Sequence, residues 1–327
     1  MVRAVVCRVL GPPAALSLEQ RPPAALAPGQ VRVALHACGV NFPDILMAAG
    51  KYQHKPPLPF VPGFEAAGEI VEIAPDVTGF KAGERVIARM RQGGYADEAV
   101  IDVRELLPMP AAFSFAEAAG FVVGYHTAYH ALVQRGRLGP GQVLLVHGAA
   151  GGVGLAAVEL GKLLGATVIA TGSSDAKLAI VRQRGADHVI NYSRGPFRDQ
   201  VKELTAGAGA DVIYDPVGGE VFDESLRCIA WGGRLLLIGF AGGRIPVLPA
   251  NLALLKGCAI VGVRAGEHGR RDAATGRSNM EVLLRLAGEG KLRPHISHQL
   301  PLERFAEAMQ VLLDRQAVGR VVLTTGR

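Results

Sequence analysis

Short β-branched runs dominate the chain up to about residue 120, and glycine and proline clusters separate them. Short runs at this density, divided by turn residues, are typical of a partly closed barrel rather than of a parallel sheet. We therefore predict a β-rich N-terminal region. Its clearest predicted strands are Val2–Val9, Gln30–Ala37, Glu65–Ala74 and Arg85–Arg89.

After the turn Leu138-Gly139-Pro140-Gly141, apolar strand-like runs alternate with runs that have helical spacing. Right-handed crossovers convert such alternation into a doubly wound parallel sheet, here an α/β sheet of six strands. The predicted strands are Val143–Val146, Thr167–Thr171, His188–Ile190, Asp211–Tyr214, Leu235–Ile238 and Ala259–Val263. The predicted helices between them are Val153–Leu164, Asp175–Arg184, Phe197–Ala206, Phe222–Ala230 and Asn251–Lys256.

The C-terminal segment returns to helices at Met280–Glu289 and Leu302–Leu313, followed by a strand at Arg320–Thr325. This tail is too small to bury a core of its own, so we expect it to pack onto the N-terminal region. A chain of 327 residues fits two domains. We place residues 1–124 and 265–327 in one domain and residues 125–264 in the other.

Composition narrows the classes of protein that the chain can represent. Hydrophobic residues make up 49% and charged residues 20%, which indicates a globular protein and excludes a disordered one. The net charge of +6 comes from scattered basic residues, so a small anionic ligand explains it better than a nucleic-acid surface. No apolar run is long enough for a membrane span, and we expect no membrane partner.

The cysteines Cys7, Cys38, Cys228 and Cys258 lie far apart in the sequence and form no Cys-x-x-Cys pair. Such spacing suits reduced, buried thiols rather than a disulfide framework. The N-terminus has no long apolar region of a signal peptide. We therefore expect a cytoplasmic protein.

The strongest local motif is the glycine-rich turn Ala149-Ala150-Gly151-Gly152-Val153-Gly154, which follows a predicted strand and opens a predicted helix. In this context the helix N-terminus and the turn backbone bind the diphosphate of a dinucleotide. Gly151 would let the backbone approach the diphosphate, and Gly154 would let the helix lie close to the sheet. We predict a dinucleotide site here.

The end of the second strand of this sheet distinguishes NAD from NADP. Enzymes that use NAD usually carry an acid there, whereas this strand ends in Thr171-Gly172-Ser173-Ser174. Lys177 follows one helical turn later, and Tyr192 follows the third strand. Asp175 is the counter-argument, because it lies about 20 residues after the glycines; as a first-turn helix residue it fits equally well. We predict NADPH.

Three segments carry a family resemblance: Cys38–Asp44, Pro62–Gly68 and Ala149–Gly154. They resemble the medium-chain dehydrogenase/reductase superfamily along almost the whole chain. That resemblance implies a GroES-like barrel, built from both chain ends, around a central Rossmann domain. Zinc-dependent members have a cysteine where this chain has Asn41 and a histidine where it has Phe64. Because neither an amide nor a phenyl ring suits zinc, we expect no metal.

The resemblance is greatest to the zinc-free quinone oxidoreductases, and it implies roles for individual residues. Asn41 and Thr127 would flank the nicotinamide, and Tyr52 would line the acceptor pocket. Alternatives remain open: Asn41 can cap a helix, Tyr52 can pack on Pro56 and Pro57, and His126 can pack in a helix. The implied cofactor-binding residues are Asn41, Thr127, Ala150, Gly151, Gly152, Val153, Gly172, Ser173, Lys177, Tyr192, Phe240 and Val263.

These features favour an NADPH-dependent reductase of quinones or other electron-poor acceptors, with the product proton taken from water or a hydroxyl relay. One alternative is a reductase of enals, enones or enoyl-CoA, for which Arg264, Arg270 and Arg271 would form a basic groove. Another is a non-catalytic NADPH-binding protein with a structural or RNA-binding role. The apolar run Ala259–Val263 at the sheet edge predicts a homodimer.

Overall fold

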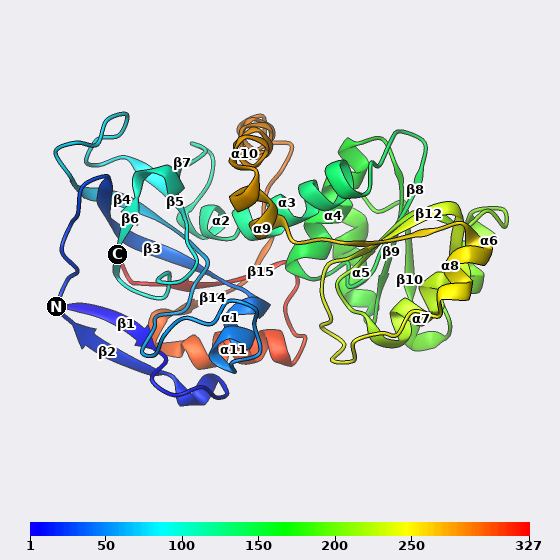
Figure 1. Cartoon of the computed structure of the whole chain (residues 1–327), viewed down its shortest axis with the longest axis horizontal. Helices are drawn as coiled ribbons and strands as arrows, with labels where there is room; N and C mark the ends of the chain where they lie inside the picture. Colours follow the sequence, from blue (N-terminus) through cyan, green and yellow to red (C-terminus); the bar gives the residue numbers. More distant parts are fainter. The chain divides into compact units, whose positions relative to one another are not determined.

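The computed structural model describes all residues from Met1 to Arg327. Its backbone contacts divide the chain into two compact units, Met1–Val123 with Ala287–Arg327, and Gly124–Leu286 (Figure 1). The second boundary lies between Leu286 and Ala287 rather than at the expected 264/265. Residues 265–286 thus belong to the central unit. Their helices α9 (Ala265–Arg271) and α10 (Ala273–Gly288) follow the last central strand, and His268 on α9 stacks on His130 at 4.4 Å between ring centroids.

The unit made from both chain ends, called here the catalytic unit, is built around a seven-stranded sheet. The order is β14-β15-β3-β4-β5-β7, with β6 paired to β3, and a separate pair is formed by β1 and β2. This arrangement confirms the expected GroES-like β-rich domain. The bounds are β1 Val2–Val6, β2 Ser17–Arg21, β3 Gln30–Val40, β4 Glu65–Ile73, β5 Arg85–Arg89, β6 Glu98–Asp102, β7 Leu106–Pro108, β14 Ile296–Pro301 and β15 Arg320–Thr324; the helices are α1 Phe42–Ala48, α2 Phe115–Ala119 and α11 Phe305–Leu313.

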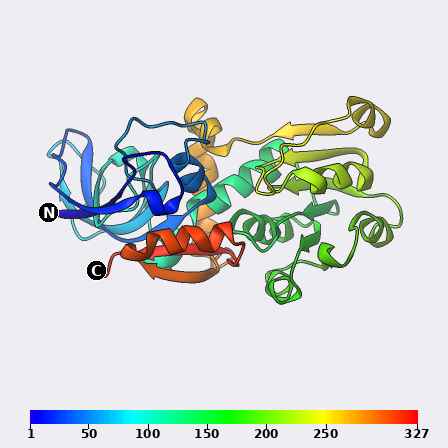
Figure 2. The same cartoon turned by 90° about the horizontal axis from the view of Figure 1, so that it is seen from below.

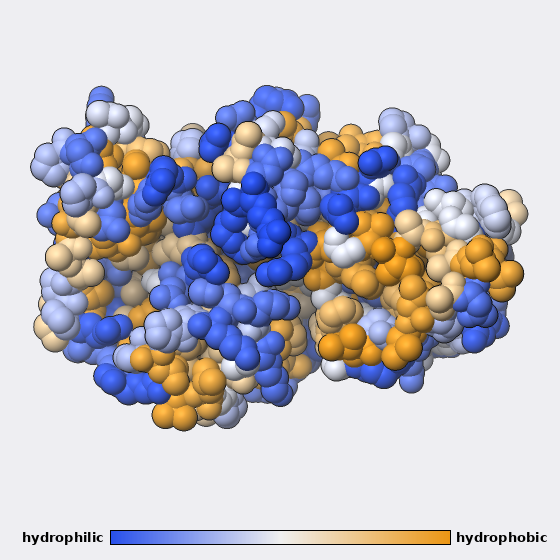
Figure 3. Space-filling model, in the orientation of Figure 1, coloured by the Kyte–Doolittle hydropathy of each residue, from blue (hydrophilic) through white to orange (hydrophobic).

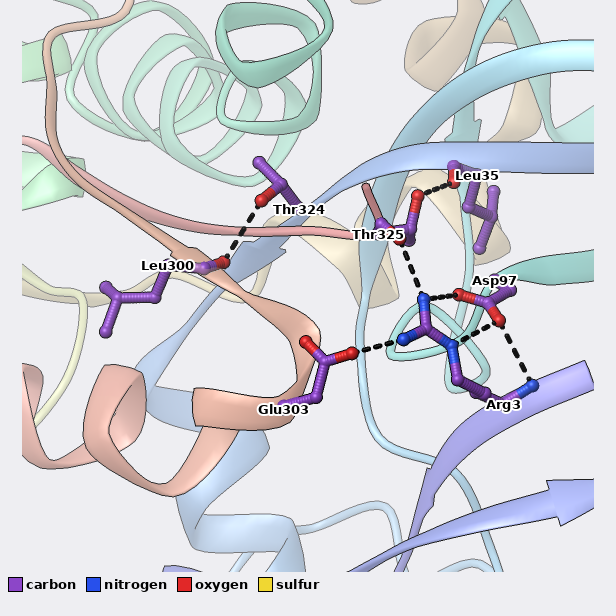
Figure 4. Close-up of polar contacts among 7 residues, drawn as sticks. All are labelled: Arg3, Leu35, Asp97, Leu300, Glu303, Thr324 and Thr325. Atoms are coloured by element: carbon purple, nitrogen blue, oxygen red, sulfur yellow. Dashed lines mark hydrogen bonds and ion pairs between the residues drawn. The ribbon is translucent and has the colours of Figure 1, made fainter. Parts of the chain in front are cut away.

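Long-range pairing joins the two chain ends within this unit. Strand β15 runs antiparallel to β3, with Val321 opposite Val40, which confirms that the tail packs onto the N-terminal region. Arg3 adds a polar link: its guanidinium donates to both carboxylate oxygens of Asp97 and, at 2.8 Å, to the carbonyl of Thr325 (Figure 4). It also pairs with Glu303. The unit therefore depends on residues from both ends of the sequence.

The central unit, called here the nucleotide unit, contains a six-stranded sheet in the order β10-β9-β8-β11-β12-β13. All five pairings are parallel, and helices lie on both sides of the sheet (Figure 2). This confirms the predicted doubly wound Rossmann fold. The strands are β8 Val143–Val146, β9 Thr167–Gly172, β10 His188–Asn191, β11 Ala210–Asp215, β12 Ile229–Leu237 and β13 Ala259–Gly262; the helices are α3 Val122–Tyr129, a π-helical turn His130–Arg135, α4 Gly152–Leu163, α5 Asp175–Gln183, α6 Arg198–Leu204, α7 Gly219–Cys228 and α8 Ala250–Lys256.

The strand order places a topological switch point between β8 and β11, because the chain proceeds from β8 toward β9 on one side and returns to β11 on the other. Ligands of open parallel sheets bind outside the carboxyl ends of the strands at such a point. The inner strands β8, β9, β11 and β12 are rich in buried aliphatic side chains, as expected for a sheet covered on both faces, whereas the edge strand β13 has no buried residue. None of the helices is both long and apolar enough to cross a membrane.

Candidate functional site

The glycine-rich turn lies at the switch point, between the end of β8 at Val146 and the start of α4 at Gly152. A Cβ on Gly154 would lie 2.3 Å from the carbonyl oxygen of Gly148 and 2.9 Å from Cα of Ala149. No side chain fits at that distance, so helix α4 can lie on the turn only with glycine at this position. The glycine is thus required by close approach to the turn itself, rather than by contact with the sheet as expected.

The same turn presents backbone N–H groups toward the carboxyl edge of the sheet. Gly151 is the N-cap of α4, and its own N–H donates to Gly148 O at 2.9 Å. The first N–H groups of the helix have no acceptor inside it, and they carry the positive end of the helix dipole. Ala150, Gly151, Gly152 and Val153 are all half-buried there. This backbone geometry fits a diphosphate group.

The ends of β9 and β10 bring the predicted phosphate-binding residues to one edge. Gly172 pairs with Asn191 across these two strands, so Ser173 and Tyr192 each follow directly after a paired residue. Lys177 lies in the first turn of α5 and is half-buried, and this burial lowers its pKa. An anion beside Lys177 would favour its charged form. This edge therefore combines hydroxyl groups with a partly desolvated cation.

Asp175, the acid that argues for NAD, is already engaged by the neighbouring strand end. Its Oδ1 accepts a hydrogen bond from Asn191 Nδ2 at 2.8 Å, and its Oδ2 pairs with Arg194. Ser174 is the N-cap of α5, although its side chain makes no capping hydrogen bond. Arg194 has no local signal in the sequence, because an arginine two residues after Tyr192 belongs to no motif of its own.

The loops after β12 and β13 contain two other predicted cofactor residues. Phe240 follows β12 and is 38% exposed; its ring covers Gly218, where an added Cβ would lie 2.9 Å from Cδ1. Val263 follows β13, is buried, and donates its N–H to Leu237 O at 3.0 Å. Both residues lie at carboxyl ends of strands on the β11 side of the switch point.

Helix α3 carries Thr127, the predicted nicotinamide contact in the nucleotide unit. Thr127 is half-buried, and the preceding Tyr125 donates its hydroxyl to Glu159 on α4. Arg184 pairs with the other oxygen of Glu159 at 3.0 Å. This network ties α3 to the helix that follows the glycine-rich turn. His126 is 9% exposed and lies in the interior of α3, as the packing alternative expected.

In the catalytic unit, Asn41 is the N-cap of α1 and forms a capping box with Asp44, whose carboxylate accepts from the Asn41 N–H, as the capping alternative expected. The amide nitrogen donates to Glu65 Oε1 at 3.1 Å and to Gly39 O at 3.3 Å. The amide oxygen accepts from Arg320 Nη2 at 2.9 Å, and the residue is 3% exposed. Both N–H groups of this amide are therefore engaged, whereas the amide oxygen keeps a second lone pair that can accept a further hydrogen bond.

Glu65 and Arg320 form an ion pair beside Asn41 that sequence analysis did not identify. Glu65 is fully buried, and desolvation raises its pKa against the opposing effect of Arg320. Its second oxygen accepts from the N–H of Val123 at 2.8 Å. Arg320 comes from the last strand, so only the tertiary structure brings it to Asn41.

The residues at the zinc-ligand positions of metal-dependent members do not fit a metal. The Asn41 oxygen already faces the Arg320 guanidinium, and Phe64 has no donor atom. Cys38 is fully buried, and desolvation raises the pKa of its thiol to about 12. No group of three or more His, Cys, Asp or Glu side chains in the chain is arranged to hold a metal ion.

Asp44 supports this end of the catalytic unit from α1. Its Oδ2 accepts from Asn41 N at 2.8 Å and from the Tyr95 hydroxyl at 3.1 Å, and its Oδ1 accepts from Gly63 N at 2.9 Å. The carboxyl group is fully buried, and desolvation outweighs these bonds and raises its pKa to about 7. Asp44 thus joins the start of α1 to the backbone of Gly63 and to Tyr95.

Tyr52 packs edge-on against Phe64, with 5.7 Å between ring centroids, and is half-exposed. A small, mainly apolar cavity of about 230 Å³ lies beside the loop that carries Tyr52. Ligand pockets usually measure about 300–1,000 Å³, so this cavity is smaller than most of them. Its lining includes Leu10, Met47, Lys55, Leu58 and Phe60.

The sequence matches two family profiles, one described as alcohol dehydrogenase GroES-like domain over residues 27–111 and one described as zinc-binding dehydrogenase over residues 152–280. The quinone oxidoreductase-like protein 2 homolog of Nematostella vectensis is 44% identical over 326 residues, covering 99% of this chain and 89% of that protein.

Solved structures agree with this relationship. The quinone oxidoreductase of Pseudomonas syringae superposes with a TM-score of 0.92 at 30% identity, over 99% of this chain and 100% of that chain. The Escherichia coli quinone oxidoreductase, solved in complex with NADPH, gives 0.91 at 28% identity, over 99% and 100%. Sequence similarity to these relatives extends along nearly the whole chain, and the solved structures share its fold. This chain therefore belongs to the quinone oxidoreductase type of the medium-chain dehydrogenase/reductase superfamily and is an oxidoreductase.

Proposed function

We propose that this oxidoreductase uses NADPH to reduce quinones or similar electron-poor acceptors, and that it does so without zinc. The observation that carries the cofactor assignment is the edge formed by Ser173, Lys177 and Tyr192. The acid that would hold the ribose of NADH, Asp175, is instead engaged by Arg194 and Asn191. The E. coli relative bound to NADPH adds support for this choice.

Bound NADPH would supply the hydride. The residues of this chain bind and orient: the turn from Ala150 to Val153 holds the diphosphate, and Gly172, Ser173, Lys177 and Tyr192 hold the 2′-phosphate. Phe240 and Val263 would contact the bound cofactor in the nucleotide unit, and Thr127 and Asn41 would contact its nicotinamide. Tyr52 lines the acceptor side. Orientation supplies much of the acceleration for an acceptor that is already electrophilic.

The residues around Asn41 support zinc independence. A simple alcohol needs a Lewis acid to lower its hydroxyl pKa, and neither Asn41, whose amide oxygen accepts from Arg320, nor Phe64 suits a zinc ion. The profile described as zinc-binding dehydrogenase matches residues 152–280, which do not include these positions. Quinone reduction needs no such Lewis acid, because the acceptor takes up the hydride readily.

The alternative acceptor, an enoyl-CoA, would need free positive charge for its phosphates. Arg270 and Arg271 each lie 2.8 Å from Glu267, and Arg264 lies 4.0 Å from it. This shared carboxylate reduces the field that the three arginines present to an anion.

No side chain of the site stands out as a proton donor. Asp44 and Glu65 are fully buried, and their carboxylates are engaged by hydrogen bonds. The proposal is therefore that the reduced acceptor takes its proton from water or through a hydroxyl relay. A reduced product that carries no solvent deuterium after reaction in deuterated buffer would contradict this proposal.

We also propose a homodimer formed through the edge of the nucleotide sheet. Strand β13 is the last strand on its side, and apolar surface covers the neighbouring α8 end of the unit (Figure 3). Trp231 is 79% exposed, Leu254 80% and Leu255 66%. Open strand edges beside large apolar surfaces are usually covered by a partner.

The unpaired state of all four cysteines is consistent with a reducing compartment such as the cytoplasm.

Cofactor binding and turnover test the proposal separately. Nicotinamide fluorescence would measure the affinities for NADPH and NADH, and turnover would then be compared on a quinone, an enal and an enoyl-CoA. We expect tighter binding of NADPH and fastest turnover of the quinone, unchanged by a zinc chelator. Preference for the enal or the thioester would move the assignment to the enoyl reductases. Failure to bind either dinucleotide would favour a non-catalytic role.

A further inference from the structure

A buried histidine lies between the end of β8 and the glycine-rich turn. His147 follows Val146 and precedes Gly148, and it is 0% exposed. Its Nδ1 lies 2.8 Å from the Thr171 hydroxyl on β9, and its Nε2 lies 2.8 Å from the Ser225 hydroxyl on α7. The ring of Phe197 packs beside the imidazole at 4.8 Å between centroids. Both ring nitrogens therefore have hydroxyl partners in the interior.

The direction of each hydrogen bond follows from Ser225. Its hydroxyl donates to the carbonyl of Val221 at 2.6 Å, so it accepts the proton on Nε2 of His147. The unprotonated Nδ1 then accepts from the Thr171 hydroxyl. Burial lowers the pKa of His147 to about 3, so the ring stays neutral and keeps this tautomer at neutral pH.

The three residues connect the segments that form the dinucleotide site. His147 directly precedes the diphosphate turn, and Thr171 directly precedes Gly172 and Ser173. The backbone reinforces the link, because Ala149 N–H donates to Thr171 O at 3.1 Å. Ser225 anchors the imidazole to α7, which begins at Gly219 beyond the end of β11. A shift of any one segment would change the spacing of the others.

We propose that His147, bridging Thr171 and Ser225, is a positioning residue that holds the diphosphate turn and the 2′-phosphate loop at the spacing NADPH requires. This inference rests on the proposed use of NADPH. The affinity for a ligand that is bound at both loops, such as NADPH, depends on the separation of the loops. NADH has no 2′-phosphate, so its affinity depends mainly on the diphosphate turn. The network thus sets the preference for NADPH over NADH without touching either.

Thr171→Val is the sharpest test, because it removes the hydroxyl donor to Nδ1 and keeps the branched shape of the side chain. Loss of one buried hydrogen bond corresponds to roughly a 10-fold change in an equilibrium constant. We expect the Kd for NADPH to rise about 10-fold and that for NADH to change less than about 3-fold. The readout is fluorescence titration of both cofactors, together with the thermal midpoint of the free protein.

Thr205→Val is the matched control. The Thr205 hydroxyl also makes partly buried hydrogen bonds, to Val201 O and from Gly209 N, each at 2.8 Å, but it lies at the end of α6. We expect this variant to retain the wild-type ratio of NADPH to NADH affinity. An equal loss for both cofactors in Thr171→Val, or the same ratio in both variants, would overturn the positioning role. If the wild-type protein binds neither dinucleotide, the proposed function itself fails.

A second measurement remains informative if Thr171→Val does not fold. Nitrogen-15 spectra of the wild-type imidazoles report the tautomer and charge of His147 directly. We expect a neutral ring protonated on Nε2 between pH 5 and 8, and loss of this single tautomer in Ser225→Ala. A positively charged ring, or protonation on Nδ1, would overturn the hydrogen-bond directions on which the inference depends.

Discussion

Arg320 Nη2 lies 2.9 Å from the amide oxygen of Asn41, although 279 residues separate the two in sequence. Arg320 begins β15, and Asn41 follows directly after β3, its antiparallel partner in the sheet. The pairing of the first and last parts of the chain therefore places a buried cation beside the residue that stands in a zinc-ligand position. Glu65 completes the group by pairing with Arg320.

The buried pair of Glu65 and Arg320 predicts a strong coupling between two substitutions. Arg320→Met leaves the Glu65 carboxylate buried without a counter-charge, and breaking a buried pair in this way costs about 3–5 kcal/mol. Glu65→Gln combined with Arg320→Met removes both charges, so we expect recovery of more than about half of that loss. Urea unfolding of both variants measures this. Equal destabilisation of the single and double variants would show that charge is not the cause.

Lys177→Ala tests the 2′-phosphate site. Hydrogen bonds to charged groups contribute about 1.5–3 kcal/mol, so the Kd for NADPH is expected to rise roughly 10- to 100-fold, with little change for NADH. Fluorescence titration measures both affinities. Lys202→Ala, on the exposed face of α6, is the control and is expected to change neither. Equal weakening of both cofactors by Lys177→Ala would place this lysine elsewhere than at the phosphate.

Asp175→Asn asks whether this acid holds a ribose. Because Asp175 already pairs with Arg194, we expect NADH affinity to change less than about 2-fold. NADPH affinity should stay the same or increase, since a negative charge near the 2′-phosphate is removed. The matched control is Asp223→Asn on α7, which breaks the exposed pair between Asp223 and Arg244. A loss of NADH affinity of about 10-fold or more would show that Asp175 does hold the ribose.

Asp44 makes the stability of the catalytic unit depend on pH. Burial raises its pKa from 3.8 to about 7, so between these values the folded protein binds more protons than the unfolded chain. Stability is therefore fully present below about pH 4 and declines as pH rises toward 7. We expect the urea concentration at the unfolding midpoint of the wild type to decrease as pH rises from 5 to 7.5. In Asp44→Asn this decrease should be smaller.

The control for this pH dependence is Asp102→Asn. Arg104 lowers the pKa of the exposed Asp102 carboxyl to about 2, which lies outside the measured window. The Asp102→Asn variant should keep the wild-type slope. A slope that persists unchanged in Asp44→Asn would assign the pH dependence to another group.

Leu254→Glu tests the proposed dimer. A charge at this exposed position on α8 would be buried in a contact between two copies, which is unfavourable. We expect light scattering at micromolar concentration to show twice the 34.3 kDa chain mass for the wild type and the single-chain mass for the variant. Leu204→Glu, at an exposed position on α6, should remain dimeric. A monomeric wild type would show that the dimer proposal is wrong.

Local patterns in the sequence were sufficient to predict the nucleotide sheet. The alternation of apolar strands with helical runs predicted six parallel strands, and the structure has them in the expected doubly wound order. Gly154 was recognisable because a strand–glycine–helix turn occupies few residues and its steric requirement is local. The ends of β9 and β10 were likewise identifiable, which placed Ser173, Lys177 and Tyr192 at one edge.

The tertiary structure alone decided which partners these residues have. Asn41 is the N-cap of α1, as one alternative expected, but local sequence did not predict that its side chain also bonds to Glu65 and Arg320. Strand β3 extends to Val40 rather than Ala37 because β15 pairs with its end. Such contacts depend on the packing of distant segments, whereas periodicity reports only the few residues within one turn or strand. The sequence thus determined the elements and their order, and packing decided the charges and hydrogen bonds within the site.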